Sequence, residues 1–116
     1  MTLSPQDERL WAGIELFNAG EYFACHDVWE ELWSDILGAE RNFIKGLIHV
    51  TVALHHFVEG NPAGGRKMSR SAVKYLSQYP GDYLQLDIAS LLAELEASGW
   101  QPSIDDKRPV LRAVNH

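Results

Sequence analysis

Residues 22–33 decide the fold, and they read Tyr22-Phe23-Ala24-Cys25-His26-Asp27-Val28-Trp29-Glu30-Glu31-Leu32-Trp33. At about 100° per residue, the apolar side chains fall on one broad arc of a helix, while Asp27 and Glu31 fall on the far side. His26 and Glu30 lie one helical turn apart at the edge of that arc, so we expect both to be partly buried. A partly buried ionisable group needs a hydrogen bond, an opposite charge or a metal. These two residues are therefore the first candidates for a functional site.

Further helices are predicted on both sides of this segment, and no strand pattern competes with them. Ser4-Pro5 predicts the start of a first helix, because a cap followed by proline suits that position, and Gly20 predicts its end. A third helix is expected from about Glu40 to Glu59. Its apolar residues cover more than half of its circumference, so we expect it to be central. Gly46 and Ala53 share one flank, where another helix could approach closely.

The remaining helices are predicted from turn and cap residues. Asn61 followed by Pro62 predicts the start of a fourth helix, and Tyr79-Pro80-Gly81-Asp82 predicts a turn. Asp87 is expected to cap a fifth helix that ends at Gly99. The fold class is therefore all-α, a compact bundle of about five helices with mostly antiparallel neighbours, spanning residues 1–101 as one domain. Residues 102–116 form a C-terminal tail that could dock on the bundle through a short helix carrying Val110, Leu111 and Val114.

Composition excludes several classes of protein. A chain of 116 residues with 46% hydrophobic residues is one domain that can bury its own core. The net charge of −6 argues against nucleic acid as the main partner, because phosphate contacts need clustered lysine and arginine. No apolar run approaches the ~18 residues of a membrane span, and no secretory leader is expected. Cys25 is the only cysteine, which excludes an intrachain disulfide and favours a cytoplasmic location.

The third helix has a polar arc of its own, formed by Arg41, Lys45, His49, His56 and Glu59. If this arc faces the second helix, it meets His26 and Glu30; otherwise it is the solvent side of a central helix. A meeting of the two arcs leaves two outcomes. One is a structural network, such as Glu30 with Arg41, and the other is a divalent metal site of the His-plus-carboxylate type.

The spacing of these residues is only a weak indicator of a metal. His26 and Glu30 could bind one ion together, but the pattern is neither the His-Glu-x-x-His of zinc proteases nor the Glu-x-x-His of di-iron bundles. Cys25 falls inside the apolar arc, so an inert thiol is expected rather than a nucleophile. The start of the fourth helix, residues 61–66, could hold an anion through free N–H groups, although a tightly packed helix junction is favoured there.

Three ordered motifs resemble a known family. They are Phe17-Asn18-x-Gly20-x-Tyr22-Phe23-x-x-His26-Asp27-x-x-Glu30-x-x-Trp33, Arg41-x-Phe43-x-x-Gly46-Leu47-Ile48, and Ala53-x-x-His56-x-x-x-Gly60-Asn61-x-x-Gly64. They resemble the family catalogued as domain of unknown function 309, and the match covers about residues 10–95. The resemblance implies a small all-helical prokaryotic protein and, in some catalogues, a predicted metal-dependent hydrolase without an established substrate. Its characteristic polar residues fall on His26, Asp27, Glu30, Arg41, His56 and Asn61.

Two positions depart from the family pattern. Ala24 stands where the family usually has an acid, and Asp27 stands where glutamate is commoner. If that missing acid binds a metal in the family, this chain would bind metal poorly. The helical wheel places Ala24 away from the edge that carries His26 and Glu30, which favours a cluster that never included the missing acid.

Two hypotheses of different classes result. In the favoured one, the protein is a structural or interaction module, a homo-oligomer or the binder of an unknown protein or small molecule. Its polar cluster, with Arg41 and Asn61, is then a structural network, and its four tryptophans, Trp11, Trp29, Trp33 and Trp100, contribute partly to an interface. A buried network predicts that Glu30→Ala costs ~3 kcal/mol or more.

The alternative is a metal-dependent hydrolase. His26, Glu30 and His56 would then hold a divalent ion such as zinc, and Asp27 or His49 would position or deprotonate a water.

Overall fold

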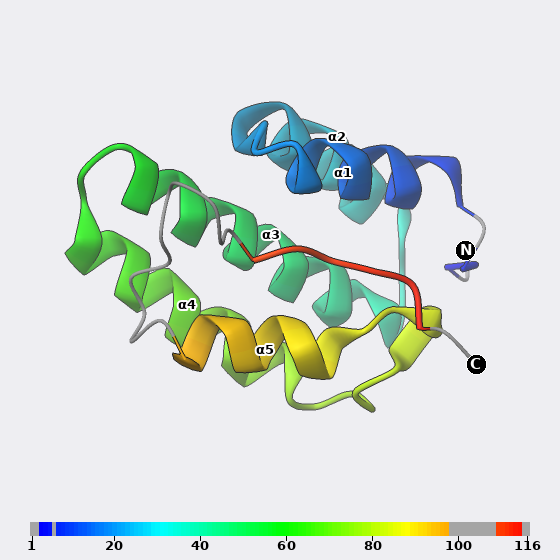
Figure 1. The fold of residues 1–116 in the computed structure, drawn as a ribbon. Coiled ribbons are helices and arrows are strands. Elements are labelled where there is room, and N and C mark those ends of the chain that lie inside the picture. The colour runs from blue at the N-terminus through cyan, green and yellow to red at the C-terminus, as the bar shows by residue number, and fades with distance from the viewer. Residues whose placement is uncertain (1–2, 6, 98–108, 115–116) are drawn as a thin grey trace.

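The computed structural model describes residues 3–5, 7–97 and 109–114, and within them the chain forms an all-α domain (Figure 1). The described residues contain no β-strand beyond a single isolated bridge between Leu86 and Ala113. The elements are α1 (Glu8–Asn18), α2 (Tyr22–Asp35), α3 (Glu40–Val58), α4 (Pro62–Leu76), the short 3-10 helix η1 (Tyr83–Gln85) and α5 (Ile88–Ala97). The predicted fold class is confirmed.

Most helix ends lie where the cap residues predict them. The Asn61 side chain accepts a hydrogen bond from the Gly64 N–H at 3.1 Å, with proline next in the chain, and Asp87 accepts from the Ser90 N–H at 3.1 Å. The start of α1 is different from the prediction. Asp7, not Ser4, is its cap and accepts a hydrogen bond from the Arg9 N–H at 2.9 Å. A carboxylate at this position also favours the positive end of the helix dipole.

α3 is the central helix, as predicted, and lies between the α1–α2 pair and the α4–α5 pair (Figure 1). Its most extensive packing is against α4. Gly46 permits this approach, because a Cβ atom added there would lie 2.8 Å from the side chain of Leu76. Ala53, on the same flank, is fully buried. The predicted close-approach flank of the third helix is therefore confirmed.

α1 and α2 meet at an equally close contact. The Trp29 indole is fully buried, stacks on Phe17 at 6.1 Å between ring centroids and donates its N–H to the Leu10 carbonyl at 3.2 Å. Gly13 faces that indole, and a Cβ atom added there would lie 1.9 Å from the indole nitrogen. Trp29 therefore fixes α2 on α1, which orients the rest of α2 toward α3.

The described part of the C-terminal tail, 109–114, packs on the bundle as an extended segment, not as the predicted short helix. The side-chain amide of Asn18 accepts from the Leu111 N–H at 2.8 Å and donates to the Leu111 carbonyl at 2.9 Å, and Leu111 is buried. The Asp87 N–H donates to the Arg112 carbonyl at 2.8 Å. The tail therefore joins the end of α1 to the start of α5 (Figure 1). The predicted end of α5 at Gly99, and Trp100, lie outside the described residues.

No helix among the described residues is long and apolar enough to cross a membrane. On the arc of α3 between α2 and α4, the side chains of Arg41, Lys45, His49, Val52 and His56 are all only half-buried. This arc contains most of the candidate residues.

Candidate functional site

Two stripes of incompletely buried side chains run along the junction of α2 and α3. The α2 stripe is Phe23, His26, Glu30 and Trp33, and the α3 stripe is Arg41, Lys45, His49 and Val52. Spacings of three and four residues place each set along one side of its helix. We call these eight residues together the open face, because Phe23 is exposed and the other seven are half-buried.

The two stripes run antiparallel. Phe23 near the start of α2 lies 6.5 Å from His55 near the end of α3, measured between ring centroids. Trp33 near the end of α2 lies against Arg41 near the start of α3. The open face therefore has an apolar end, at Phe23 and Val52, and a cationic end, at Arg41 and Lys45.

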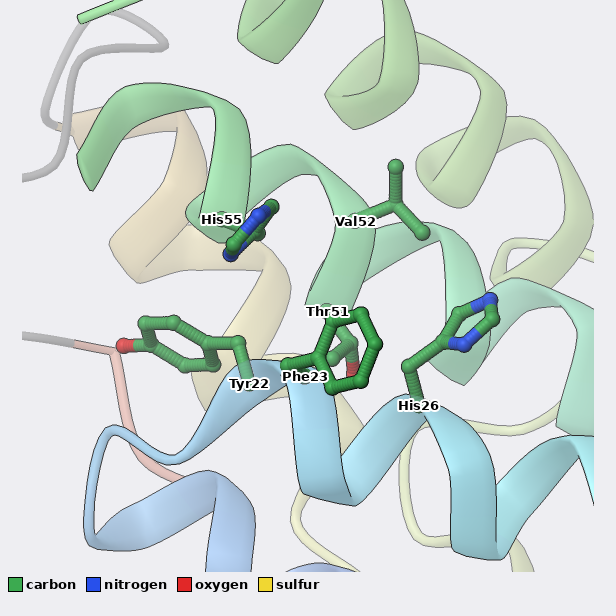
Figure 2. A pocket seen from close by; sticks show the side chains of 6 residues that line it. All are labelled: Tyr22, Phe23, His26, Thr51, Val52 and His55. Carbon is green, nitrogen blue, oxygen red and sulfur yellow. The ribbon is translucent and has the colours of Figure 1, made fainter. Parts of the chain in front are cut away.

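A pocket of about 200 Å³ opens at the apolar end of the open face (Figure 2). Its lining residues come from both helices and are Tyr22, Phe23, His26, Thr51, Val52 and His55. Phe23 is 70% exposed at its edge, and the His26 and His55 imidazoles lie on either side of Val52 (Figure 2). Most of this lining is apolar, so the pocket suits a hydrocarbon group better than a charged one.

His26 and Glu30 contact each other within α2 and are not part of a buried network. The His26 Nε2 atom lies 3.3 Å from the Glu30 carboxylate, and its Nδ1 atom lies 3.6 Å from the Asp27 carboxylate. The side chains of His26 and Glu30 are 35% and 46% exposed. Pairs one helical turn apart at this exposure contribute only a few tenths of a kcal/mol.

Glu30→Ala is therefore expected to change the free energy of unfolding by no more than about 0.5 kcal/mol, because the His26 imidazole it leaves can be solvated. Urea denaturation at neutral pH measures this change. The sequence-based expectation of ~3 kcal/mol applied to a buried network. A measured loss of that size would restore the network interpretation.

Arg41 does not reach Glu30, so the predicted pair of these residues is not formed. Its guanidinium lies over the Trp33 ring, 3.8 Å from the ring centroid, and its Nε atom is buried without a hydrogen-bond partner. Lys45 lies 5.4 Å from the centroid of the Tyr75 ring on α4. Among the described side chains, neither cation forms an ion pair, so each can still pair with an opposite charge on a partner.

His49 faces α4 rather than the His26 pair. Its Nδ1 atom lies 2.7 Å from the Ser71 hydroxyl, and its ring packs edge-on against Tyr75. Burial lowers the pKa of His49, and the nearby charge of Lys45 lowers it further, while Glu30 acts in the opposite direction. His49 is therefore a neutral imidazole at pH 7.

The predicted metal ligands are not brought together. His56 lies at the junction of α3 and α4, where its Nδ1 atom is 3.2 Å from the Asn61 side-chain nitrogen. No group of three or more His, Cys, Asp or Glu side chains within residues 3–5, 7–97 and 109–114 could hold a metal ion. His26, Glu30 and His56 therefore do not form a donor set that fits a divalent ion, so the roles predicted for Asp27 and His49 beside such an ion have no support in this geometry.

The other sites considered from the sequence have structural explanations. At the start of α4, the Gly64 N–H donates to the Asn61 side chain and the Gly65 N–H to the Asn61 carbonyl, so neither is free for an anion. A Cβ atom added at Gly65 would lie 2.6 Å from the Phe57 ring, as expected for a tight junction. Cys25 is fully buried, and burial raises the pKa of its thiol to about 12. It is therefore an inert thiol at neutral pH.

The sequence interpretation missed the pocket itself. Val52 and His55 lie outside the polar arc predicted for the third helix. The available signal was the stripe of Phe23, His26, Glu30 and Trp33 along α2, which combines one aromatic edge with charged residues. Such a mixed stripe is typical of a contact surface rather than of a solvated face.

The fold and this face define a small all-helical domain with an open apolar pocket. The chain belongs to the family described as "Domain of unknown function (DUF309)", whose model matches residues 10–68. It is similar to an uncharacterized protein of Aquifex aeolicus (strain VF5), with 28% identity over 95 residues, which cover 81% of this chain and 28% of that protein. It is also similar to the uncharacterized protein YpuF of Bacillus subtilis (strain 168), with 30% identity over 64 residues, which cover 54% and 37% of the two chains. The matches thus span about a third of the length of these curated relatives.

Proposed function

We propose that this protein is an interaction module that binds a partner protein through the open face, with an apolar side chain of the partner in the α2–α3 pocket. The observation that carries the proposal is Phe23, which is 70% exposed beside a pocket of about 200 Å³. A large aromatic side chain exposed beside an apolar hollow is a feature of binding surfaces. The pocket volume is sufficient for one leucine or phenylalanine side chain.

Two further observations support this proposal. Half-buried cations at the other end of the open face lack ion-pair partners among the described side chains, so a partner can supply the opposite charge. The matched segments form only a minor part of both curated relatives, as is common for a module that functions beside other segments. The net charge of −6 favours a protein partner over nucleic acid, and the single cysteine favours a cytoplasmic location.

The hydrolase activity implied by the family resemblance is not part of this proposal. Metal-assisted hydrolysis needs at least three protein ligands and an open position for water. Within the part of the chain that the structure describes, no three His, Cys, Asp or Glu side chains are placed to hold an ion, and His56 lies beside Asn61 at the α3–α4 junction.

The pocket can be tested with the fluorescent apolar probe 1-anilinonaphthalene-8-sulfonate at low micromolar protein concentration. Phe23→Ser is expected to reduce the fluorescence of the bound probe severalfold, because it removes one wall of the pocket. Leu37→Ser is the matched control, since Leu37 is 68% exposed but lies in the α2–α3 connection away from the pocket. Both variants are expected to keep the wild-type stability to within ~0.5 kcal/mol. Equal fluorescence losses in the two variants, or no loss in Phe23→Ser, would contradict the proposal.

A further inference from the structure

We propose that the partner on the open face is a second copy of this chain, related to the first by a two-fold axis that runs along α2 and α3, between them. This inference rests on the proposed function and names its partner. It starts from the charges of the open face, which are separated by helix. Glu30 is on the α2 stripe, whereas Arg41 and Lys45 are on the α3 stripe.

The position of each residue along the helices decides how two copies could meet. Because the stripes are antiparallel, Phe23 lies level with His55 and Trp33 lies level with Arg41. Glu30, about one turn from Trp33, therefore lies near the level of Lys45, one turn from Arg41. A two-fold axis parallel to the helices keeps every residue at its level and places α2 of one copy over α3 of the other. Phe23 of each copy then lies over the pocket of the other, and Glu30 of each copy lies over Lys45 and His49 of the other.

The other two-fold arrangement in the same plane is disfavoured by charge. An axis perpendicular to the helices would place α3 over α3 with its direction reversed, so the cationic end at Arg41 and Lys45 of each copy would lie over the apolar end at Phe23 and Val52 of the other. Burying a cation without an opposite charge costs several kcal/mol. The parallel axis instead pairs each acidic stripe with a cationic one, and it does so twice. A partner with an unrelated sequence would need a surface whose charges and shape complement the open face. A two-fold copy supplies the complementary charges itself, because the α2 stripe of each copy meets the α3 stripe of the other.

The arrangement also gives α2 and α3 the environment of a four-helix bundle. Each copy contributes two antiparallel helices, and α2 of one copy lies antiparallel to α3 of the other. The half-buried side chains of Trp33 and Val52 become part of its interior. The ring of Phe23, which is 70% exposed in a single copy, is covered.

Sedimentation equilibrium on the full chain at low salt tests this inference through a charge exchange. Wild type is expected to be a dimer, and Lys45→Glu or Glu30→Lys alone should each raise the dissociation constant about tenfold or more, because each places like charges together. The double variant Glu30→Lys/Lys45→Glu should return it to within about threefold of wild type, since the pair is restored with its signs reversed. Glu31→Lys is the matched control, with the same charge change on the exposed far side of α2, and should leave the constant unchanged.

Each outcome decides between the possibilities. Recovery in the double variant, together with weaker association of wild type at high salt, supports the arrangement. Two weakened single variants without recovery would overturn it. A wild-type monomer at every concentration would overturn self-association. If the probe result with Phe23→Ser still holds in that case, the open face binds a different protein and the proposed function stands. The salt dependence of wild-type association needs no variant. Association that does not weaken at high salt would overturn the arrangement even if a substitution impairs folding.

Discussion

Trp29→Ala is expected to lower the free energy of unfolding by about 3–5 kcal/mol, the range for truncating a fully buried tryptophan. Trp29 is fully buried between α1 and α2, stacks on Phe17 and satisfies the Leu10 carbonyl through its N–H. Its removal leaves a cavity between the two helices. Gly13, which faces the indole, has no side chain that could fill this cavity. Urea denaturation followed by far-ultraviolet circular dichroism measures the loss.

Phe23→Ala is the control for this prediction, because it also removes an aromatic ring from α2. Phe23 is 70% exposed, so its removal is expected to change the stability of a single copy by less than about 0.5 kcal/mol. Both variants are compared at a low protein concentration, where association adds no stability. Equal losses in the two variants would contradict the assignment of Trp29 to the core and Phe23 to a binding surface.

Gly13→Ala is expected to destabilise the protein by about 3 kcal/mol, at the upper end of the range for overpacking. In an unconstrained helix interior the same change stabilises by up to about 1 kcal/mol, because alanine is the better helix former. Here the new Cβ atom would lie 1.9 Å from the Trp29 indole nitrogen. That indole is fully buried and cannot rotate away, so α1 and α2 must separate.

The sign of this effect is expected to reverse when Trp29 is absent. In a Trp29→Ala background, Gly13→Ala should cost nothing or stabilise slightly, because the methyl group then occupies the cavity. Chemical denaturation of the two single variants and the double variant completes the cycle. An additive loss in the double variant would show that the Gly13 contact does not depend on Trp29.

The sequence predicted well those features that depend on one helix at a time. The caps at Asn61 and Asp87, the length of α3 and its close-approach flank at Gly46 follow from local patterns, and the structure confirms each of them. The predicted start of the first helix was wrong by a few residues, because Asp7 and not Ser4 caps α1. The prediction of a short helix in the tail was also wrong, because the extended conformation of the tail depends on a contact of Leu111 with Asn18, 93 residues away in the chain.

The candidate site was predicted only in part, and the reason is geometric. A helical wheel places His49 and His56 on one arc of α3, but it does not determine which neighbouring helix each side chain meets. In the structure His49 meets Ser71 of α4, and His56 meets Asn61 at the α3–α4 junction. His26 has Val52 and His55 as neighbours instead. The rotation of one helix against another is set by contacts such as Trp29 with Gly13, which no periodicity reveals.

The central claim is that the open face of α2 and α3 is where this protein associates. Two-dimensional ¹H–¹⁵N spectra of the wild-type chain, recorded from low micromolar to about 1 mM, test it most directly because they locate the contact residue by residue. We expect concentration-dependent shifts at the amides of Phe23, Glu30, Lys45 and Val52, with little change along α5. Shifts concentrated on α5 or on the exposed side of α4 would contradict the account, and spectra that do not change with concentration would overturn self-association through this face.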